Sequence, residues 1–190
     1  MERILKLAII IGSTREGRFG DTVGRWFAQE AAAHGAFSVD LIDLIDIKLP
    51  PSHRSRPTPE VAAFRARLGA ADAFVIVTPE YNHSYPASLK HAVDQAYGEW
   101  MAKPVGFVSY GGTVGGVRAI EHLRNVFAEV HAATIRDYLC FINARRQFDA
   151  EGKLIDPEGP HNAAKNMLDR LAWWAEALRT AREARPYVKS

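Results

Sequence analysis

The stretch that decides the fold is Leu7-Ala-Ile-Ile-Ile-Gly-Ser-Thr-Arg-Glu-Gly-Arg-Phe-Gly-Asp-Thr-Val23. It opens with apolar, mostly β-branched residues, which are typical of a short buried strand. A loop rich in glycine, hydroxyl and arginine side chains follows at 12–20. From Asp21 the apolar residues recur at helical spacing until Gly35, a residue that commonly ends helices. The stretch therefore predicts a strand, a polar loop and a helix.

The loop at 12–20 has the composition of a phosphate-binding loop. A loop between a parallel strand and a helix offers free backbone N–H groups and the positive end of the helix to an anion. Ser13 and Thr14 can donate hydroxyl hydrogen bonds, and Arg15 and Arg18 can form paired, charge-assisted bonds to phosphate oxygens. The alternative interpretation is a solvated turn with surface arginines.

The glycine spacing excludes two common nucleotide-binding loops. No Gly-Lys-Ser/Thr sequence ends the loop, as a Walker A motif requires. Gly12, Gly17 and Gly20 do not match the G-x-G-x-x-G pattern of dinucleotide-binding proteins. A phosphate loop of neither kind indicates a mononucleotide.

The composition is that of an ordinary globular protein, with 47% apolar and 24% charged residues, and residues 1–190 are expected to form a single domain. The net charge of +2 favours neither nucleic acid nor a membrane surface as a partner. No apolar run reaches the roughly 20 residues of a membrane span, and the N-terminus has no signal-peptide pattern. Because Cys140 is the single cysteine, no internal disulfide can form. These features predict a cytoplasmic protein.

The rest of the chain repeats the alternation of apolar strand and amphipathic helix. Thr58-Pro59-Glu60 has the pattern of a helix start, with proline in the first turn. The Pro- and Arg-rich segment 49–59 is either a functional loop or a solvated excursion. Strands are expected at 7–11, 37–43, 73–78, 105–110 and 134–141, and helices at 21–34, 59–69, 86–100, after 116, and at 162–182.

Runs that are apolar on both faces, such as 73–78, belong in the centre of a parallel sheet covered by helices. We therefore expect an α/β fold with a five-stranded parallel sheet of order 2-1-3-4-5 and helices on both faces. In that order the chain reverses between strands 1 and 3, and the ligand crevice lies at their carboxyl ends. The loops 12–22, 78–86 and 109–116 meet there.

The second and third of these loops can flank a flat ring. Pro79-Glu80-Tyr81-Asn82 offers backbone N–H groups and an aromatic edge, and Gly111-Gly112 lets backbone lie against a ring plane. A flat polar ring that carries one phosphate is what flavin mononucleotide (FMN) presents.

The sequence resembles the NADPH-dependent FMN reductases, a flavodoxin-like family that includes chromate and quinone reductases and some azoreductases. The resemblance covers about 5–140 and implies a flavodoxin-like three-layer sandwich. The matching residues are Gly12-Ser13-Thr14-Arg15, then Pro79-Glu80-Tyr81-Asn82 with Ser84, Pro86, Leu89 and Lys90, and Ser109-Tyr110-Gly111-Gly112 with Gly115, Gly116, Arg118 and Ala119.

The resemblance implies FMN as the cofactor, with its phosphate on the first loop. Many relatives have serine and asparagine where this chain has Arg18 and Gly20, and Arg18 can supply charge in place of the serine. The cofactor-binding residues are expected to be Ser13, Arg15, Arg18, Gly20, Asp21, Thr22, Pro79, Glu80, Tyr81, Asn82, Ser109, Gly111 and Gly112.

The implied activity is an NAD(P)H oxidoreductase that works by ping-pong hydride transfer. NADPH or NADH reduces the flavin and leaves, and a quinone, azo compound, chromate or free flavin then takes the electrons. No catalytic side chain and no metal are predicted, and a homodimer or homotetramer is expected. Arg54, Arg56 and Arg118 are candidates for a 2′-phosphate contact. An electron carrier that does not itself oxidise NAD(P)H is the alternative.

The sequence patterns of hydrolases and of metal sites are absent. Ser109 lacks the G-x-S-x-G spacing of a hydrolase, and the histidines lack metal-ligand spacing. His83 lies in a crevice loop and is either structural or substrate-facing, and Cys140 is expected to be a small core residue. Of Trp173 and Trp174 at most one can face the core, which leaves the other to pack against a partner.

Overall fold

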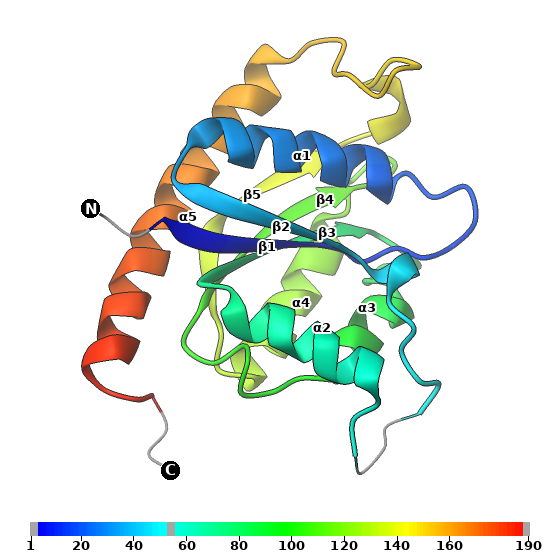
Figure 1. Cartoon of the computed structure of the whole chain (residues 1–190). Coiled ribbons are helices and arrows are strands. Elements are labelled where there is room, and N and C mark those ends of the chain that lie inside the picture. The colour runs from blue at the N-terminus through cyan, green and yellow to red at the C-terminus, as the bar shows by residue number, and fades with distance from the viewer. Residues whose placement is uncertain (1–3, 53–55, 188–190) are drawn as a thin grey trace.

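Five parallel strands form a single sheet at the centre of the computed structural model, which describes residues 4–52 and 56–187 (Figure 1). The sheet has the order β2-β1-β3-β4-β5, so the predicted topology is confirmed. Its strands are β1 (Leu5–Ile11), β2 (Phe37–Asp43), β3 (Ala73–Pro79), β4 (Pro104–Tyr110) and β5 (Ala133–Phe141).

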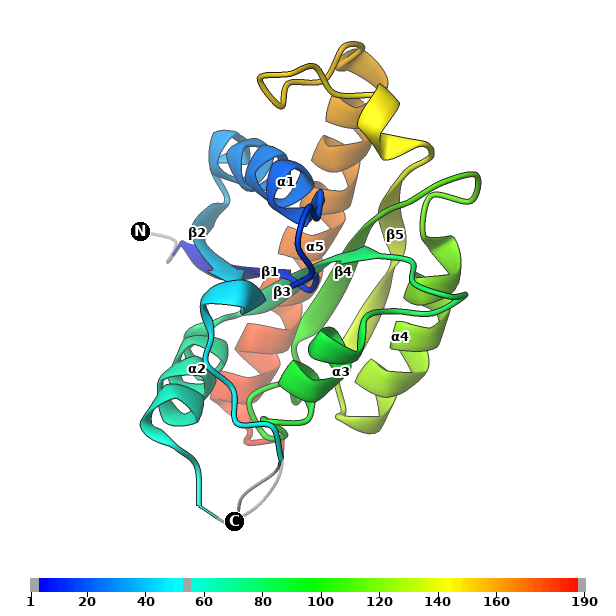
Figure 2. The same ribbon diagram turned by 90° about the vertical axis from the view of Figure 1, so that its right-hand side faces the viewer.

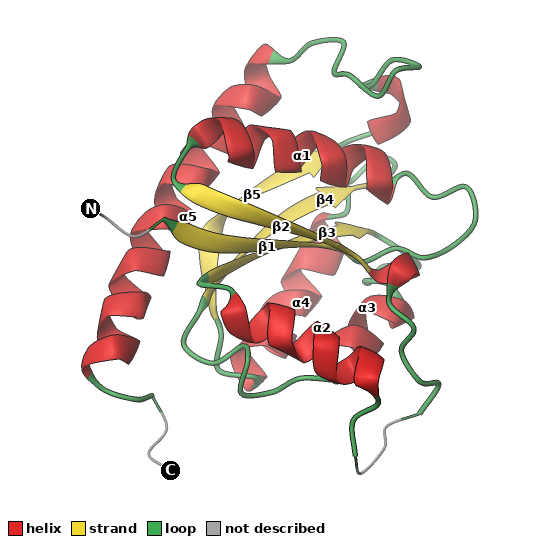
Figure 3. Ribbon diagram, viewed as in Figure 1, coloured by secondary structure: helices red, strands yellow, loops and turns green. Residues whose placement is uncertain are grey.

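Helices cover both faces of the sheet, as Figure 3 shows by colour. One face packs against α1 (Gly20–His34) and α5 (Glu158–Ala184). The other packs against α2 (Pro59–Ala70), α3 (Ala87–Val93) and α4 (Val117–Glu129). Short 3-10 turns follow two strands: η1 (Leu44–Asp46) after β2 and η2 (Ala144–Arg146) after β5. The expected three-layer sandwich is therefore confirmed.

Alternation along the strands creates two separate cores. In β1, Leu7 and Ile9 belong to the core under α1 and α5, whereas Ala8 and Ile10 belong to the core on the opposite face. Successive side chains of a strand point to opposite faces, so a central strand needs apolar residues at every position. This requirement explains why the inner strands are continuous apolar runs.

The helix that follows β1 packs against the sheet through a glycine. A Cβ at Gly24 would lie 2.5 Å from Ile11 Cδ1, so only glycine allows α1 to pack this near to the end of β1. The helix ends at Gly35, which adopts the left-handed conformation with φ of 81°. Close packing of α1 fixes where its N-terminus meets the loop that precedes it.

Two helices differ from their predicted extents. The helix expected to run from Pro86 to Trp100 ends at Val93, because the Trp100 indole N–H and the Ala96 N–H both donate to the Val93 carbonyl. Trp100 is nevertheless fully buried, whereas Tyr97, within the same predicted range, is 49% exposed.

The last helix, α5, is longer than predicted at both ends. Trp173 and Trp174 are 65% and 41% exposed, so neither side chain belongs to the core. Their rings instead contact each other edge to face, with centroids 5.3 Å apart. No helix in the described part of the chain is both long and apolar enough to cross a membrane.

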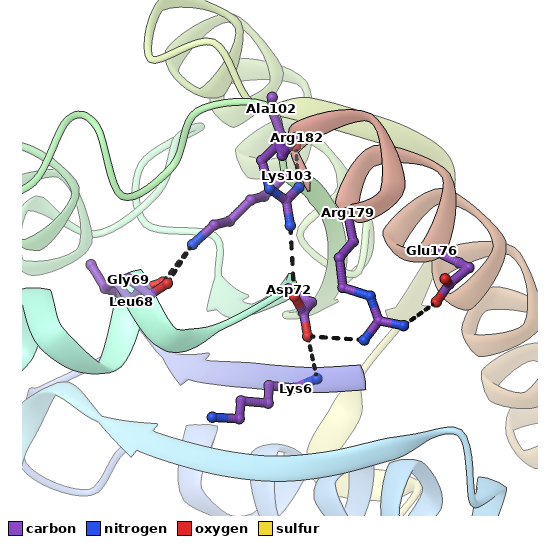
Figure 4. A network of polar contacts seen from close by, with 9 residues as sticks. All are labelled: Lys6, Leu68, Gly69, Asp72, Ala102, Lys103, Glu176, Arg179 and Arg182. Atoms are coloured by element: carbon purple, nitrogen blue, oxygen red, sulfur yellow. Dashed lines mark hydrogen bonds and ion pairs between the residues drawn. The ribbon is translucent and has the colours of Figure 1, made fainter. Parts of the chain in front are cut away.

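A polar network joins α5 to the edge of the sheet at which β1 and β3 begin (Figure 4). The Asp72 carboxylate accepts the Lys6 backbone N–H at 2.9 Å and faces the guanidinium groups of Arg179 at 3.8 Å and Arg182 at 3.6 Å. This carboxylate thus ties the C-terminal part of α5 to β1.

Lys103 adds a second link at the same edge. Its ammonium group donates to the carbonyls of Leu68 and Gly69, at 2.9 and 3.0 Å, where α2 ends. A cation stabilises this end of a helix because unpaired carbonyls gather there. Burial nevertheless lowers the pKa of Lys103 to about 8, and nearby Arg182 adds to the effect.

Candidate functional site

A cavity of about 380 Å³ opens at the carboxyl edge of the sheet, where the loops after β1, β3, β4 and β5 meet. Figure 2 views the molecule from this edge. Its size is in the usual range for small-molecule sites. It is lined by Arg15, Arg18, Phe19, Pro79, Glu80, Tyr81, Tyr110, Gly111, Gly112, Asn143, Ala144, Arg145 and Arg146.

The loop after β1 presents unpaired backbone donors. Gly12 N–H continues the sheet by donating to Val77 O at 2.9 Å, and a turn then joins Arg18 N–H to Arg15 O. Between these bonds, the N–H groups at 14–17 have no acceptor within the described residues. Free N–H groups ahead of a helix N-terminus suit an anion, as predicted for this loop.

Ser13 and Gly20 do not line the cavity but pack against Tyr110, which does. The Ser13 side chain is fully buried, and its hydroxyl lies 2.9 Å from the Tyr110 hydroxyl. A Cβ at Gly20 would overlap both oxygens. Burial raises the pKa of Tyr110, so this phenol stays protonated. The loop after β1 is therefore bonded to the end of β4 at the point where α1 begins.

Arg18 lines the cavity, but its guanidinium group is bonded to protein. It donates two parallel hydrogen bonds of 2.5 Å to the Asp43 carboxylate at the end of β2, and one of 2.7 Å to Ser13 O. The hydrogen bond to Asp43 raises the pKa of Arg18 above its ordinary value. In this structure Asp43 therefore pairs with the Arg18 guanidinium group, and a contact between Arg18 and a phosphate stays a prediction.

The loop after β3 brings Glu80 and Tyr81 to the cavity. Arg118 of α4 donates to Glu80 Oε1 at 2.9 Å, whereas the buried Glu80 Oε2 has no hydrogen-bond partner. The Tyr81 ring lies under Arg15, whose Cζ is 5.0 Å from the ring centroid. Asn82 sits outside the cavity lining, in a tight turn closed by two bonds between Tyr81 and Ser84, with φ of 49°.

The loop after β4 supplies Gly111 and Gly112, while Ser109 stabilises it from beneath. Ser109 is fully buried and donates to Gly115 O at 2.8 Å. The loop after β5 locks onto the glycines, because Asn143 N–H donates to Gly112 O at 2.9 Å. A Cβ at Gly112 would meet no atom within 4 Å, so this position presents bare backbone to open space.

The structure thus brings one group of predicted residues together at the cavity and leaves another outside its lining. Asp21 and Thr22 lie in the first turn of α1, and Ser13, Gly20, Asn82 and Ser109 shape the surrounding loops. Of the candidates for a 2′-phosphate, Arg118 pairs with Glu80, and Arg54 lies outside the described residues. The predicted residues in the lining are Arg15, Arg18, Pro79, Glu80, Tyr81, Gly111 and Gly112.

The sequence interpretation missed the contribution of the loop after β5. The predicted cofactor-binding residues include none from the segment after the fifth strand, yet 143–146 form one wall of the cavity. The available signal was the pair Arg145-Arg146 four residues after a predicted strand, because the carboxyl ends of parallel strands share one edge. Phe19 and Tyr110 also line the cavity, although neither is among the predicted cofactor-binding residues.

The residues present fit flavin mononucleotide. Free N–H groups at 14–17, and the lining arginines other than Arg18, which form no ion pair with any described residue, suit a phosphate dianion. The bare backbone at Gly112 and the Tyr81 ring suit a flat ring. Glu80 Oε2 offers a carboxylate acceptor, without a partner among the described residues, for an N–H group of that ring.

Comparisons with known proteins agree with this geometry. The chain is 36% identical to an NAD(P)H-dependent FMN reductase of Schizosaccharomyces pombe over 58% of its own length and 60% of that protein. It is 31% identical to a 2-hydroxy-1,4-benzoquinone reductase of a Burkholderia species, over 92% of this chain and 98% of the relative.

The fold is shared with FerB, a flavoenzyme NAD(P)H:(acceptor) oxidoreductase of Paracoccus denitrificans. The two structures align with a TM-score of 0.75 and 23% identity, over 92% of this chain and 98% of that one. A family model described as NADPH-dependent FMN reductase matches residues 5–146, which include every segment that lines the cavity. This chain therefore belongs to the NADPH-dependent FMN reductase family, as its sequence motifs predict.

Proposed function

We infer that this protein is an FMN-dependent NAD(P)H oxidoreductase. The observation that carries the inference is the coincidence of the family match, 5–146, with the four loops that enclose one cavity. A family match alone does not locate a binding site. Here the matched residues include a cavity with free N–H donors for a phosphate and open space for a ring.

The chain's residues bind and orient rather than react. The N–H groups at 14–17, together with Arg15, would hold the phosphate, and Glu80 Oε2 would accept a hydrogen bond from the ring edge. Arg118 keeps the Glu80 carboxylate aimed at the cavity through its 2.9 Å bond to the other oxygen. Bound FMN would accept a hydride from NADPH or NADH and deliver the electrons to a second substrate.

The acceptor class that we propose is a quinone. The Burkholderia relative, which aligns with this chain over 98% of its length, is named a 2-hydroxy-1,4-benzoquinone reductase. The aromatic rings and bare backbone that line the cavity also suit a flat molecule. Azo compounds, chromate and free flavin remain the other acceptors to compare. Steady-state rates with each acceptor at equal NAD(P)H concentration test the choice, and a quinone should give the highest kcat/KM.

The protein is further proposed to act as a homodimer or homotetramer in the cytoplasm. The exposed Trp173 and Trp174 provide adjacent apolar surface for association, and a single cysteine suits a reducing compartment. Light scattering of the eluting protein would measure the assembly, and cell fractionation would measure the location.

The decisive experiment is the visible absorption spectrum of the FMN-loaded protein before and after anaerobic addition of NADPH, and separately of NADH. Bleaching of the flavin bands by either nucleotide is the expected result. A bound flavin that neither nucleotide bleaches would favour the electron-carrier alternative. A protein that does not bind FMN would overturn the proposal.

A further inference from the structure

The cavity holds more positive charge than the phosphate loop alone provides. Its lining contains four arginines, of which Arg18 is neutralised by Asp43. In the described part of the chain, Arg15, Arg145 and Arg146 form no ion pair with a carboxylate. Glu80 does not offset this charge, since Arg118 pairs with it. The cavity is therefore prepared for an anion that carries more than one charge.

Arg145 reaches from the end of β5 to the loop after β1. Its Nη2 donates to Gly17 O at 2.6 Å, and its Cζ lies 5.1 Å from the centroid of the Phe19 ring. Gly17 is the last of the residues at 14–17 whose backbone N–H groups have no acceptor among the described residues. The guanidinium group therefore lies against the same loop that offers those N–H groups, although it is 128 positions away in the sequence.

The platform under Arg145 is fixed by the core. The Phe19 ring contacts Tyr110 and Phe148 edge to face, with centroid distances of 6.4 and 5.5 Å. Phe148 is 5% exposed and belongs to the core under α1 and α5. Stacking on an anchored ring limits the movement of an otherwise exposed side chain, and one carbonyl leaves most of its N–H donors available.

We propose that Arg145 is a specificity-determining residue that binds the phosphate of FMN and so distinguishes FMN from unphosphorylated flavin. This inference rests on the proposed function. It assigns to Arg145 the role that the sequence pattern suggested for Arg18, whose guanidinium group is bonded to Asp43 and Ser13. The contact with Gly17 favours Arg145 over Arg146 for this role, since Arg146 lines the cavity but makes no hydrogen bond to the loop in the described part of the chain.

Riboflavin differs from FMN only by the missing phosphate, so the ratio of the two affinities isolates the phosphate contacts. Deflavinated protein is titrated with FMN and with riboflavin, and quenching of flavin fluorescence gives both Kd values. The variants are Arg145→Gln, which removes the charge, and Arg145→Lys, which keeps it. Arg136→Gln on β5, outside this cavity, is the matched control for loss of one positive charge.

For Arg145→Gln we expect FMN affinity to fall about tenfold or more, with riboflavin affinity within about twofold of the starting protein. Arg145→Lys should recover part of the loss, and Arg136→Gln should change neither affinity. Because the lost contact is ionic, the salt dependence of FMN binding should also weaken in Arg145→Gln.

Two results would overturn the inference. An FMN-to-riboflavin ratio that Arg145→Gln leaves unchanged would remove Arg145 from the phosphate site, and an equal loss for both ligands would make it a brace for the loop only. In both cases the starting protein would still bind FMN, so the proposed function would stand. If the starting protein bound no FMN at all, both the proposed function and the inference would fail.

Discussion

The hydroxyl groups of Ser13 and Tyr110 lie 2.9 Å apart and form a buried hydrogen bond beneath the start of α1. This bond joins the loop after β1 to the end of β4, two strands away in the sheet. Gly20 passes directly over it with no room for a side chain. The geometry explains why this position requires glycine in this chain.

Gly20→Ala is expected to destabilise the protein by about 1–3 kcal/mol, because the new methyl group must displace both hydroxyls or lift the helix start. Urea unfolding of the flavin-free protein measures the change. Gly159→Ala, in the first turn of α5, is the control, since a Cβ there meets no atom within 4 Å. Equal stability of Gly20→Ala and the starting protein would contradict the packing described here.

Arg18 and Asp43 are expected to be coupled in stability rather than in binding. Breaking their doubly hydrogen-bonded pair by Arg18→Met or Asp43→Asn should each cost about 1–3 kcal/mol, because both side chains are largely shielded from water. The double variant should cost less than the sum of the two. Additive losses in urea unfolding would show that the pair makes no direct contribution.

The outline of the fold could be predicted because apolar runs and helix signals are local. Thr58 and Pro59 illustrate this: the Thr58 hydroxyl accepts the Val61 N–H and proline follows at the first position, as the pattern indicates. The end of α3 could not be predicted, because Trp100 keeps the apolar period while its indole N–H takes the Val93 carbonyl. The spacing of apolar residues indicates which side chains are buried, and buried side chains such as Trp100 continue here beyond the end of the helix.

The sequence indicates which loops meet at the candidate site, but it does not indicate which way the side chains on those loops point. Ser13 and Ser109 follow strands and carry suitable hydroxyl groups, yet they bond to Tyr110 and to Gly115 O. Partners distant in the sequence decide which way a short polar side chain points. Arg145 was missed because the segment that carries it has no periodic pattern of its own.

The two exposed tryptophans of α5 give a prediction about what stabilises the fold. Trp173→Ala should change the free energy of unfolding by less than about 1 kcal/mol, whereas Trp100→Ala should cost about 3–5 kcal/mol, because Trp100 is fully buried between Phe74 and Phe127. Thermal unfolding at several protein concentrations measures both. A large loss for Trp173→Ala at low concentration would mean that its ring supports the fold of a single chain.

Lys103 should make the free energy of unfolding increase as the pH rises from about 8 to 10.5. Its pKa is about 8 in the folded protein and near 10.5 when exposed, so between these values the unfolded chain binds more protons and deprotonation favours folding. The gain should approach about 3 kcal/mol for this almost fully buried group.

Lys103→Met tests this, although it leaves the Gly69 carbonyl without its donor and should lower stability at pH 7. The informative quantity is the difference in unfolding free energy between the two proteins, measured in urea from pH 7 to 10.5, since other titrating groups cancel in it. That difference should move in favour of the starting protein above pH 8. Parallel profiles would mean that the Lys103 ammonium group is as well solvated in the folded protein as in the unfolded chain.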